Sequence, residues 1–248
     1  MAAEFQPEGL SATMPAPAES RGVFITFEGG DGAGKSTHIR FLAKTLQERG
    51  YEVLSLREPG GTAIGERLRD LVLDKHNMEM APRTELFIYE AARAQIVSQV
   101  IRPALERGAV VLCDRFYDST VAYQGYGRGL DAAFIAAANA FACDGIAPDR
   151  TLLMVAPSAA EGLARAATVE PADRLEAAGV DFHSRVRRGF ELLAEAEPER
   201  IATVVSQELP SQTARLIFAE LQDLFPWMEE CAADDAFFAA LDEGFIHA

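Results

Sequence analysis

The chain has 248 residues, of which 49% are hydrophobic, and its 38 acidic and 23 basic side chains give a formal net charge of −15. This length is sufficient for a large buried core, so disulfides or metals are not needed to hold the fold. The acidic balance argues against binding to nucleic acid or to an anionic membrane, because basic patches supply the affinity for both.

The cysteines and the chain start give no sign of an exported or membrane protein. Cys113, Cys143 and Cys231 are widely spaced and form no C-x-x-C pair, which argues against a disulfide framework or a zinc site. No apolar run approaches the ~18 residues of a membrane-spanning helix, and the first ten residues do not resemble a secretory signal. We therefore expect a cytoplasmic protein.

Short apolar runs alternate with longer segments of helical spacing. Residues 1–21, rich in Ala, Pro, Glu and Ser, are predicted to be a disordered tail. Strands are predicted at 23–28, 51–56, 109–114, 151–156 and 200–205, and helices at 35–49, 62–74, 83–107, 131–143, 181–196 and 211–224. This alternation predicts one α/β domain over 22–225, with a parallel sheet of about five strands between two helical layers.

The last segment, 226–248, is acidic and contains no Lys or Arg. Its apolar residues Phe237, Phe238, Leu241 and Phe245 have helical spacing. We expect this extension to dock on the domain or on a partner.

A glycine-rich segment follows the first strand and matches G-x-x-x-x-G-K-[ST]. Glycines let successive backbone N–H groups surround a phosphate, and a helix that begins near Lys35 adds its free N–H groups. Lys35 is placed to reach the β- and γ-phosphates, and the Ser36 hydroxyl to ligate Mg²⁺. The predicted binding loop for a nucleoside triphosphate consists of Gly29, Gly30, Asp31, Gly32, Ala33, Gly34, Lys35, Ser36 and Thr37.

The loop alone does not identify the reaction, because GTPases, ATPases and small-molecule kinases share it. The Asn-Lys-x-Asp motif usual in GTPases is absent. The carboxylate of Asp31 would repel a triphosphate, so it is better explained as an acceptor for a sugar hydroxyl of a second substrate. A solvated loop aspartate is the alternative.

Two later segments offer groups suited to a nucleoside monophosphate. The sequence R-E-P-G-G-T at 57–62 predicts a sharp turn after the second strand, at the sheet edge where ligands bind. Tyr89 and Arg93 are four residues apart on one helix, so the ring can stack on a base while the guanidinium binds a phosphate or the base. A core aromatic beside a surface arginine is the alternative for this pair.

The third strand ends in Asp114, followed by Arg115. A carboxylate at this end of a strand is suited to the Mg²⁺ shell, and the neighbouring arginine is suited to bridge two phosphate groups as charge develops. A structural ion pair between the two is the alternative.

Together these segments, which span about residues 23–190, resemble the bacterial thymidylate kinase family. Its loop pattern F-E-G-x-[DE]-G-x-G-K-[ST] matches 27–36, and its Arg-Glu-Pro-Gly-Gly-Thr turn and Asp-Arg-aromatic motif are both present. The resemblance implies that Asp31 contacts the 3′-hydroxyl of dTMP and that Thr120 and Gln124 touch the thymine. The acceptor site it implies consists of Asp31, Glu58, Pro59, Arg69, Tyr89, Arg93, Arg115, Thr120 and Gln124, with Tyr89 replacing the usual Phe. For Arg69 an exposed helix position is the alternative.

Phosphoryl transfer also needs cations over the γ-phosphate and a cover that excludes water. The family carries an Arg after the acidic loop residue or places arginines in a mobile lid, and position 32 here is Gly. The resemblance therefore implies a short lid at about 165–178 that supplies Arg165 and Arg174. The fourth strand, LLMVAP, departs from the family in lacking an Asp before the x-x-Pro step.

The combined prediction is a three-layer P-loop kinase fold that transfers phosphate from MgATP to dTMP. The predicted catalytic residues are Lys35, Asp114, Arg115, Arg165 and Arg174, with Ser36 and Asp114 on the metal. The resemblance also implies a homodimer, for which the 83–107 helix offers a packing face. A kinase of the same fold for another nucleoside or nucleotide, or a nucleotide-binding regulatory protein with a decayed site, remains as an alternative.

Overall fold

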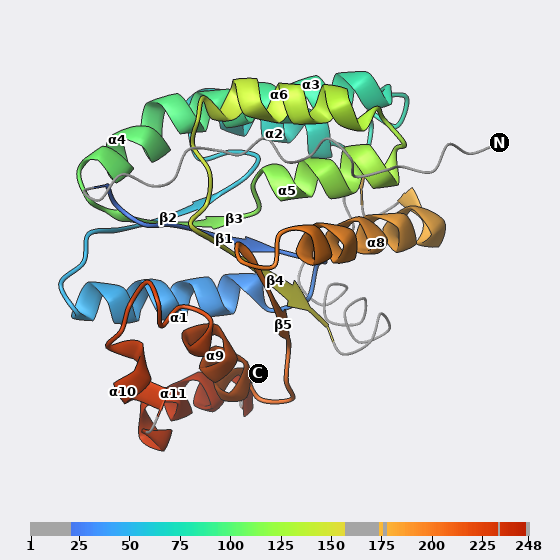
Figure 1. Ribbon diagram of the computed structural model, residues 1–248. Helices are drawn as coiled ribbons and strands as arrows, with labels where there is room; N and C mark the ends of the chain where they lie inside the picture. The colour runs from blue at the N-terminus through green and yellow to red at the C-terminus, as the bar shows by residue number, and fades with distance from the viewer. Residues whose placement is uncertain (1–20, 157–173, 176–177, 233, 247–248) are drawn as a thin grey trace.

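The structure is a computed structural model that describes residues 21–156, 174–175, 178–232 and 234–246. Apart from Arg21, the predicted N-terminal tail lies outside the described residues. Five parallel strands form one sheet in the order β2-β3-β1-β4-β5, which confirms the predicted sheet (Figure 1). The strands are β1 (Phe24–Glu28), β2 (Val53–Arg57), β3 (Val110–Asp114), β4 (Arg150–Val155) and β5 (Ile201–Val205).

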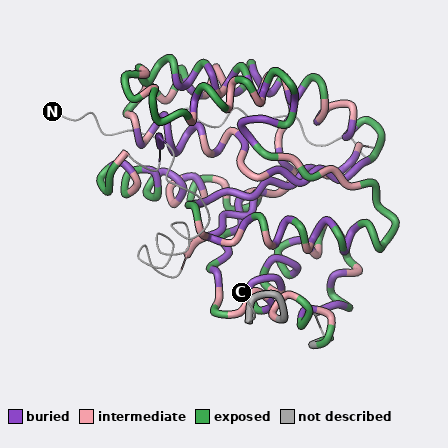
Figure 2. Tube along the Cα trace, turned by 180° about the vertical axis from the view of Figure 1, so that it is seen from behind, coloured by how far each residue is buried: buried purple, intermediate pink, exposed green. Residues whose placement is uncertain are grey.

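Helices cover both faces of the sheet, as the alternation of strands and helices predicts (Figure 1). One face carries α1 (Lys35–Glu48), α9 (Pro210–Ala219), α10 (Met228–Ala232) and α11 (Asp235–Ile246). The other side carries α2 (Ala63–Leu73), α3 (Pro82–Ile96), α4 (Arg102–Glu106), α5 (Tyr117–Thr120), α6 (Ala132–Cys143) and α8 (Val180–Ala196). The three central strands β1, β3 and β4 are almost continuously buried, whereas the edge strands β2 and β5 are partly exposed (Figure 2).

Side chains that alternate along the strands enter different clusters on the two faces. Ile25 and Phe27 of β1 pack with α1 and α9. Phe24, which points the other way, packs with α4 and meets Phe116 edge to face. Because all the strand pairs are parallel, the carboxyl ends of the strands lie at one edge of the sheet.

The long helix predicted over 83–107 is not continuous. It is interrupted between α3 and α4 by a wider π-helical segment, η1 (Val97–Ile101), in which the Arg102 N–H donates to the Val97 carbonyl five residues earlier. Pro103 follows at the start of α4, and its missing N–H prevents regular α-helical hydrogen bonding there. The proline therefore accounts for the break that periodicity did not reveal.

A second helical region, not predicted from the sequence, follows β3. It consists of α5 and the π-helical segment η2 (Val121–Gly127), and α8 packs along it. Two glycines permit this approach, because a Cβ at Gly127 would lie 2.6 Å from Phe182 and one at Gly189 would lie 2.7 Å from Tyr126.

The C-terminal extension packs on the domain. Met228, Cys231 and Phe238 are buried in the same apolar cluster as α1 and α9. Of the two docking alternatives that the sequence left open, the structure shows the one on the domain.

Candidate active site

The glycine-rich loop joins β1 to α1 and wraps around the start of that helix. Gly29 has a φ of +116°, and a Cβ there would lie 2.0 Å from the Met154 carbonyl oxygen, so only glycine fits against β4. Gly34 precedes the helix in the left-handed region, with a φ of +88°. The Lys35 ammonium turns back over the loop and donates to the carbonyls of Gly29 and Gly30 at 3.1 and 2.9 Å.

This loop forms the floor of a cavity of about 790 Å³. The cavity is lined by side chains from the segments that follow β1, β2 and β3, and by side chains of α2, α3 and η2. The predicted site residues that line it are Asp31, Gly32, Ala33, Gly34, Lys35, Ser36, Thr37, Glu58, Pro59, Arg69, Tyr89, Arg93, Asp114, Arg115, Thr120 and Gln124. Residues far apart in the sequence thus meet in one pocket, and Arg69 lies there rather than on an open helix face.

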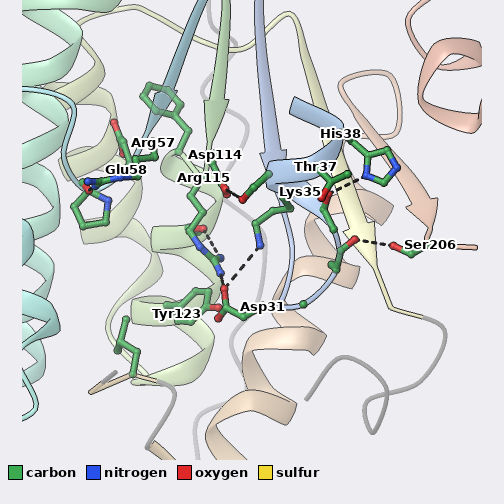
Figure 3. Close-up of a pocket in the computed structure, with 18 of the residues that line it drawn as sticks. Asp31, Lys35, Thr37, His38, Arg57, Glu58, Asp114, Arg115, Tyr123 and Ser206 are labelled. Atoms are coloured by element: carbon green, nitrogen blue, oxygen red, sulfur yellow. Dashed lines mark hydrogen bonds and ion pairs between the residues drawn. The ribbon is translucent and has the colours of Figure 1, made fainter. Parts of the chain in front are cut away.

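Asp31, Arg115 and Lys35 form a charged group at the centre of the pocket (Figure 3). One Asp31 carboxylate oxygen lies 2.7 Å from Arg115 Nη2 and 3.9 Å from Lys35 Nζ. Burial alone would raise the pKa of Asp31, but the charges of Arg115 and Lys35 bring it down to about 2. Burial lowers the pKa of Lys35, and the charge of Arg115 lowers it further. The group carries a net positive charge, as a site for phosphates requires.

A buried carboxylate that the sequence analysis did not single out, Glu28, holds the backbone next to Arg115. One oxygen accepts hydrogen bonds from the backbone N–H groups of Phe116 and Ser119, and the other accepts from the Ser119 hydroxyl at 2.6 Å. Burial, with the nearby charge of Asp118, raises the pKa of Glu28 to about 7. Arg115 itself has a φ of +69°, a left-handed conformation that these bonds help to fix.

Ser36 and Asp114 offer oxygen ligands suited to Mg²⁺. The Ser36 hydroxyl lies at the start of α1 and donates to Asp114 Oδ2 at 3.3 Å, so both groups face the same point beside the loop. The described residues contain no cluster of three or more acidic, His or Cys ligands. Mg²⁺ commonly binds through one or two protein oxygens together with substrate phosphates and water, so the pair fits this ion.

Arg93 lies deep in the pocket wall and not on the surface. Its side chain is 1% exposed and forms ion pairs at 2.9 Å with Glu58 and with Glu90. It also donates to Thr120 and to Asn139. Burial raises the pKa of Glu58 to about 7 despite the arginine. The alternative of a surface arginine at this position is wrong, because the guanidinium is buried. It links Glu58, in the turn after β2, to Thr120, in the helical region after β3.

Gln124 and Arg174 meet at another buried carboxylate, Glu85 of α3. The Gln124 amide donates to Glu85 at 2.8 Å, and Arg174 pairs with the same carboxylate at 2.6 Å. Arg174 also donates to the Val72 carbonyl at 2.9 Å, and it does not line the pocket. The structure therefore brings Gln124 to the pocket but holds Arg174 in the wall behind it. Arg165 and most of the predicted lid lie outside the described residues.

A further part of the pocket wall, after β5, was not predicted. Ser206, Gln207 and Pro210 line the cavity, and the Ser206 hydroxyl donates to the Ala33 carbonyl of the phosphate loop at 2.8 Å. In Figure 3 Ser206 lies on the opposite side of Lys35 from Arg115 and Tyr123. The general rule that ligands bind beyond the carboxyl ends of parallel strands was the available signal for this wall.

Comparisons with known proteins show which family this chain is similar to. A sequence model of the thymidylate kinase family matches residues 27–217. The thymidylate kinase of Desulfovibrio desulfuricans is 51% identical over 194 residues, which cover 76% of this chain and 89% of that protein. That of Clavibacter sepedonicus is 52% identical over 183 residues, 74% of this chain and 86% of that protein. The crystal structure of thymidylate kinase from Ehrlichia chaffeensis matches with a TM-score of 0.67 at 32% identity, over 81% of this chain and 99% of that one. The chain therefore belongs to the thymidylate kinase family.

Proposed function

We propose that this chain catalyses in-line transfer of the γ-phosphoryl group of MgATP to dTMP, giving ADP and dTDP. The chain is a thymidylate kinase and a transferase of nucleotide biosynthesis, as its family membership indicates. The comparisons favour neither another substrate nor a decayed site. The residue roles rest on one observation. Asp31 forms ion pairs with Arg115 and with Lys35, and all three side chains line the same cavity.

The phosphate loop binds the triphosphate in this proposal. The backbone N–H groups from Gly29 to Thr37 surround the β-phosphate, and Lys35 leaves the Gly29 and Gly30 carbonyls to reach the β- and γ-oxygens. Ser36 and Asp114 hold Mg²⁺. The ion supplies charge neutralisation of the phosphates when it is bound.

The acceptor dTMP occupies the opposite side of the cavity. Tyr89 stacks on the thymine, while Arg93, Thr120 and Gln124 contact its polar edge. Asp31 accepts a hydrogen bond from the 3′-hydroxyl. The phosphate lies near Glu58, Pro59 and Arg69, where the Arg69 guanidinium donates to the Pro59 carbonyl at 3.0 Å and is thereby oriented.

Transfer relies on position and charge, because a phosphate oxygen is already a nucleophile. Arg115 lies between the two sides and stabilises the negative charge of the moving phosphoryl group. Arg165, from the proposed lid, adds a second cation. Arg174 was predicted to add a further cation. In the structure it pairs with Glu85, so substitution of Arg174 tests whether the residue has this catalytic role.

We also propose a homodimer that forms through α3 and α6. Phe134 and Phe141 of α6 are 51% and 89% exposed, and Phe87 of α3, 56% exposed, packs edge to face on Phe134. No residue of α6 carries a charge. Exposed aromatic side chains gathered on an uncharged face are typical of a surface that a partner covers.

We propose a cytoplasmic location. No helix within the described parts of the chain is both long and apolar enough to cross a membrane. Cys113, Cys143 and Cys231 are free thiols, as expected in a reducing compartment.

The test is release of ADP from MgATP in the presence of dTMP, dUMP, dCMP, dGMP, AMP or thymidine. We expect turnover with dTMP well above that with the other acceptors. Turnover with a different acceptor alone would replace the proposed substrate. Saturable binding of ATP and dTMP without turnover would overturn the catalytic proposal.

A further inference from the structure

The C-terminal extension packs against the two helices whose first turns line the nucleotide pocket. Phe237 and Phe238 of α11 both contact Phe41 of α1 and Phe218 of α9, with ring centroids 4.8–6.0 Å apart within this group. Met228 of α10 is fully buried in the same cluster. This segment lies beyond residue 217, where the match to the family model ends.

α11 also completes the start of α9. Pro210 opens that helix and has no N–H, and the preceding Leu209 has no side-chain oxygen that accepts a hydrogen bond. The acceptor comes instead from Asp242, whose carboxylate accepts a hydrogen bond from the Ser211 N–H at 2.9 Å. A carboxylate at this point satisfies a free N–H group and interacts favourably with the helix dipole. Asp242 therefore acts as an N-cap supplied from 31 residues further along the chain.

The capped segment is coupled to the phosphate loop. The His38 ring lies 2.8 Å from the Gly34 carbonyl and 3.1 Å from the Pro210 carbonyl, so it bridges the loop and the start of α9. Ser206 bonds the loop at Ala33, and the Thr213 hydroxyl accepts from the Gln207 N–H. A shift of the first turn of α9 would thus move the pocket wall and disturb the loop.

We propose that the C-terminal extension is a positioning element for the donor nucleotide, and that Asp242 is its key positioning residue. Asp242 touches neither substrate. It fixes the first turn of α9, and with it the wall formed by Ser206, Gln207 and Pro210 beside the phosphate loop. This inference rests on the proposed binding of ATP by that loop.

The experiment compares Asp242→Ala and Asp242→Asn with the unaltered chain. Calorimetry measures the binding of adenylyl imidodiphosphate with Mg²⁺, and separately the binding of dTMP, without turnover. Loss of a helix cap costs about 1 kcal/mol, so we expect D242A to weaken binding of the ATP analogue about fivefold and to leave dTMP binding within twofold. D242N keeps an acceptor oxygen and should restore most of the affinity.

Glu230→Ala is the matched control, because Glu230 is an exposed carboxylate of the same extension. The one tryptophan of the chain, Trp227, lies in the extension against Phe218 and Phe225, so its fluorescence shows whether the extension stays docked in each variant. The proposal would be overturned if D242A bound the ATP analogue with the affinity of the unaltered chain. It would also be overturned if D242A lost affinity equally for the ATP analogue and for dTMP. Failure of the unaltered chain to bind the analogue would overturn the proposed function together with this inference. A negative result confined to the D242A comparison would overturn this inference alone.

Discussion

Arg115 Nη2 lies 2.7 Å from an Asp31 carboxylate oxygen, so the arginine that follows β3 is joined to the phosphate loop across 84 residues of sequence. The pair lies where the two halves of the pocket meet (Figure 3). In the proposed mechanism, Asp31 contacts the acceptor nucleotide from this position and Arg115 contacts both phosphate groups. The pairing gives a physical reason for an acidic residue in a loop that binds anions.

Replacement of Arg115 by Lys should impair the chemical step. The ammonium keeps the charge but loses the planar, bidentate geometry of the guanidinium. We expect kcat for dTMP phosphorylation to fall by ~10²–10³-fold, with a smaller change in KM, because the lost interaction strengthens in the transition state. Arg107→Lys on the protein surface is the control. A kcat within threefold of the unaltered chain would show that transfer does not require the bidentate geometry of the guanidinium.

Asp31 is tested by removing its hydrogen-bond partner from the substrate. The unaltered enzyme should prefer dTMP to its 3′-deoxy analogue by ~10–100-fold in kcat/KM, because a hydrogen bond to a charged group contributes about 1.5–3 kcal/mol. Asp31→Ala should lose this preference, whatever its effect on Arg115. Steady-state kinetics of both substrates with both proteins give the comparison. A preference that persists in the variant would show that another group holds the hydroxyl.

Glu28 should make the stability of the protein depend on pH. The unfolded chain releases the proton near pH 4.5 and the folded chain holds it to about 7, so this residue lowers the free energy of unfolding as pH rises between these values. Glu28→Gln has no proton to release. The variant should therefore gain stability relative to the unaltered chain between pH 5 and pH 8, measured by urea unfolding. A constant difference across this range would mean that the pKa of Glu28 is not raised.

The five strands could be predicted from the sequence because each is a short apolar run followed by a recognisable turn or loop. The phosphate loop was predicted for a similar reason, since its chemistry is contained in consecutive residues. Glu28, by contrast, acts on Phe116 and Ser119, which lie about 90 residues away, and no local pattern indicates this. The helical region at 117–127 lacks a clear apolar period and contains two glycines, so tertiary packing against α8 decides its structure.

The homodimer depends on the exposed aromatic side chains of α6. Phe141 is 89% exposed, so its replacement by Glu should not disturb the monomer fold but should place a charge on the proposed interface. We expect sedimentation velocity to show a dimer for the unaltered chain and a monomer for F141E. Val180→Glu, at an exposed position in the first turn of α8, is the control and should leave the dimer intact. A monomer for the unaltered chain would contradict the proposal.

Arg174 separates a catalytic from a structural role. Its guanidinium pairs with buried Glu85, which also accepts from Gln124 and Arg128, so its removal leaves a buried carboxylate with fewer partners. We expect Arg174→Ala to lower the free energy of unfolding by about 1–3 kcal/mol. It should also raise KM for dTMP through Gln124 while kcat stays within a few-fold. Urea unfolding and steady-state kinetics on the same preparation test both. A ~100-fold loss of kcat with unchanged stability would instead assign Arg174 to the transferring phosphate, and the pairing with Glu85 would then have to break during turnover.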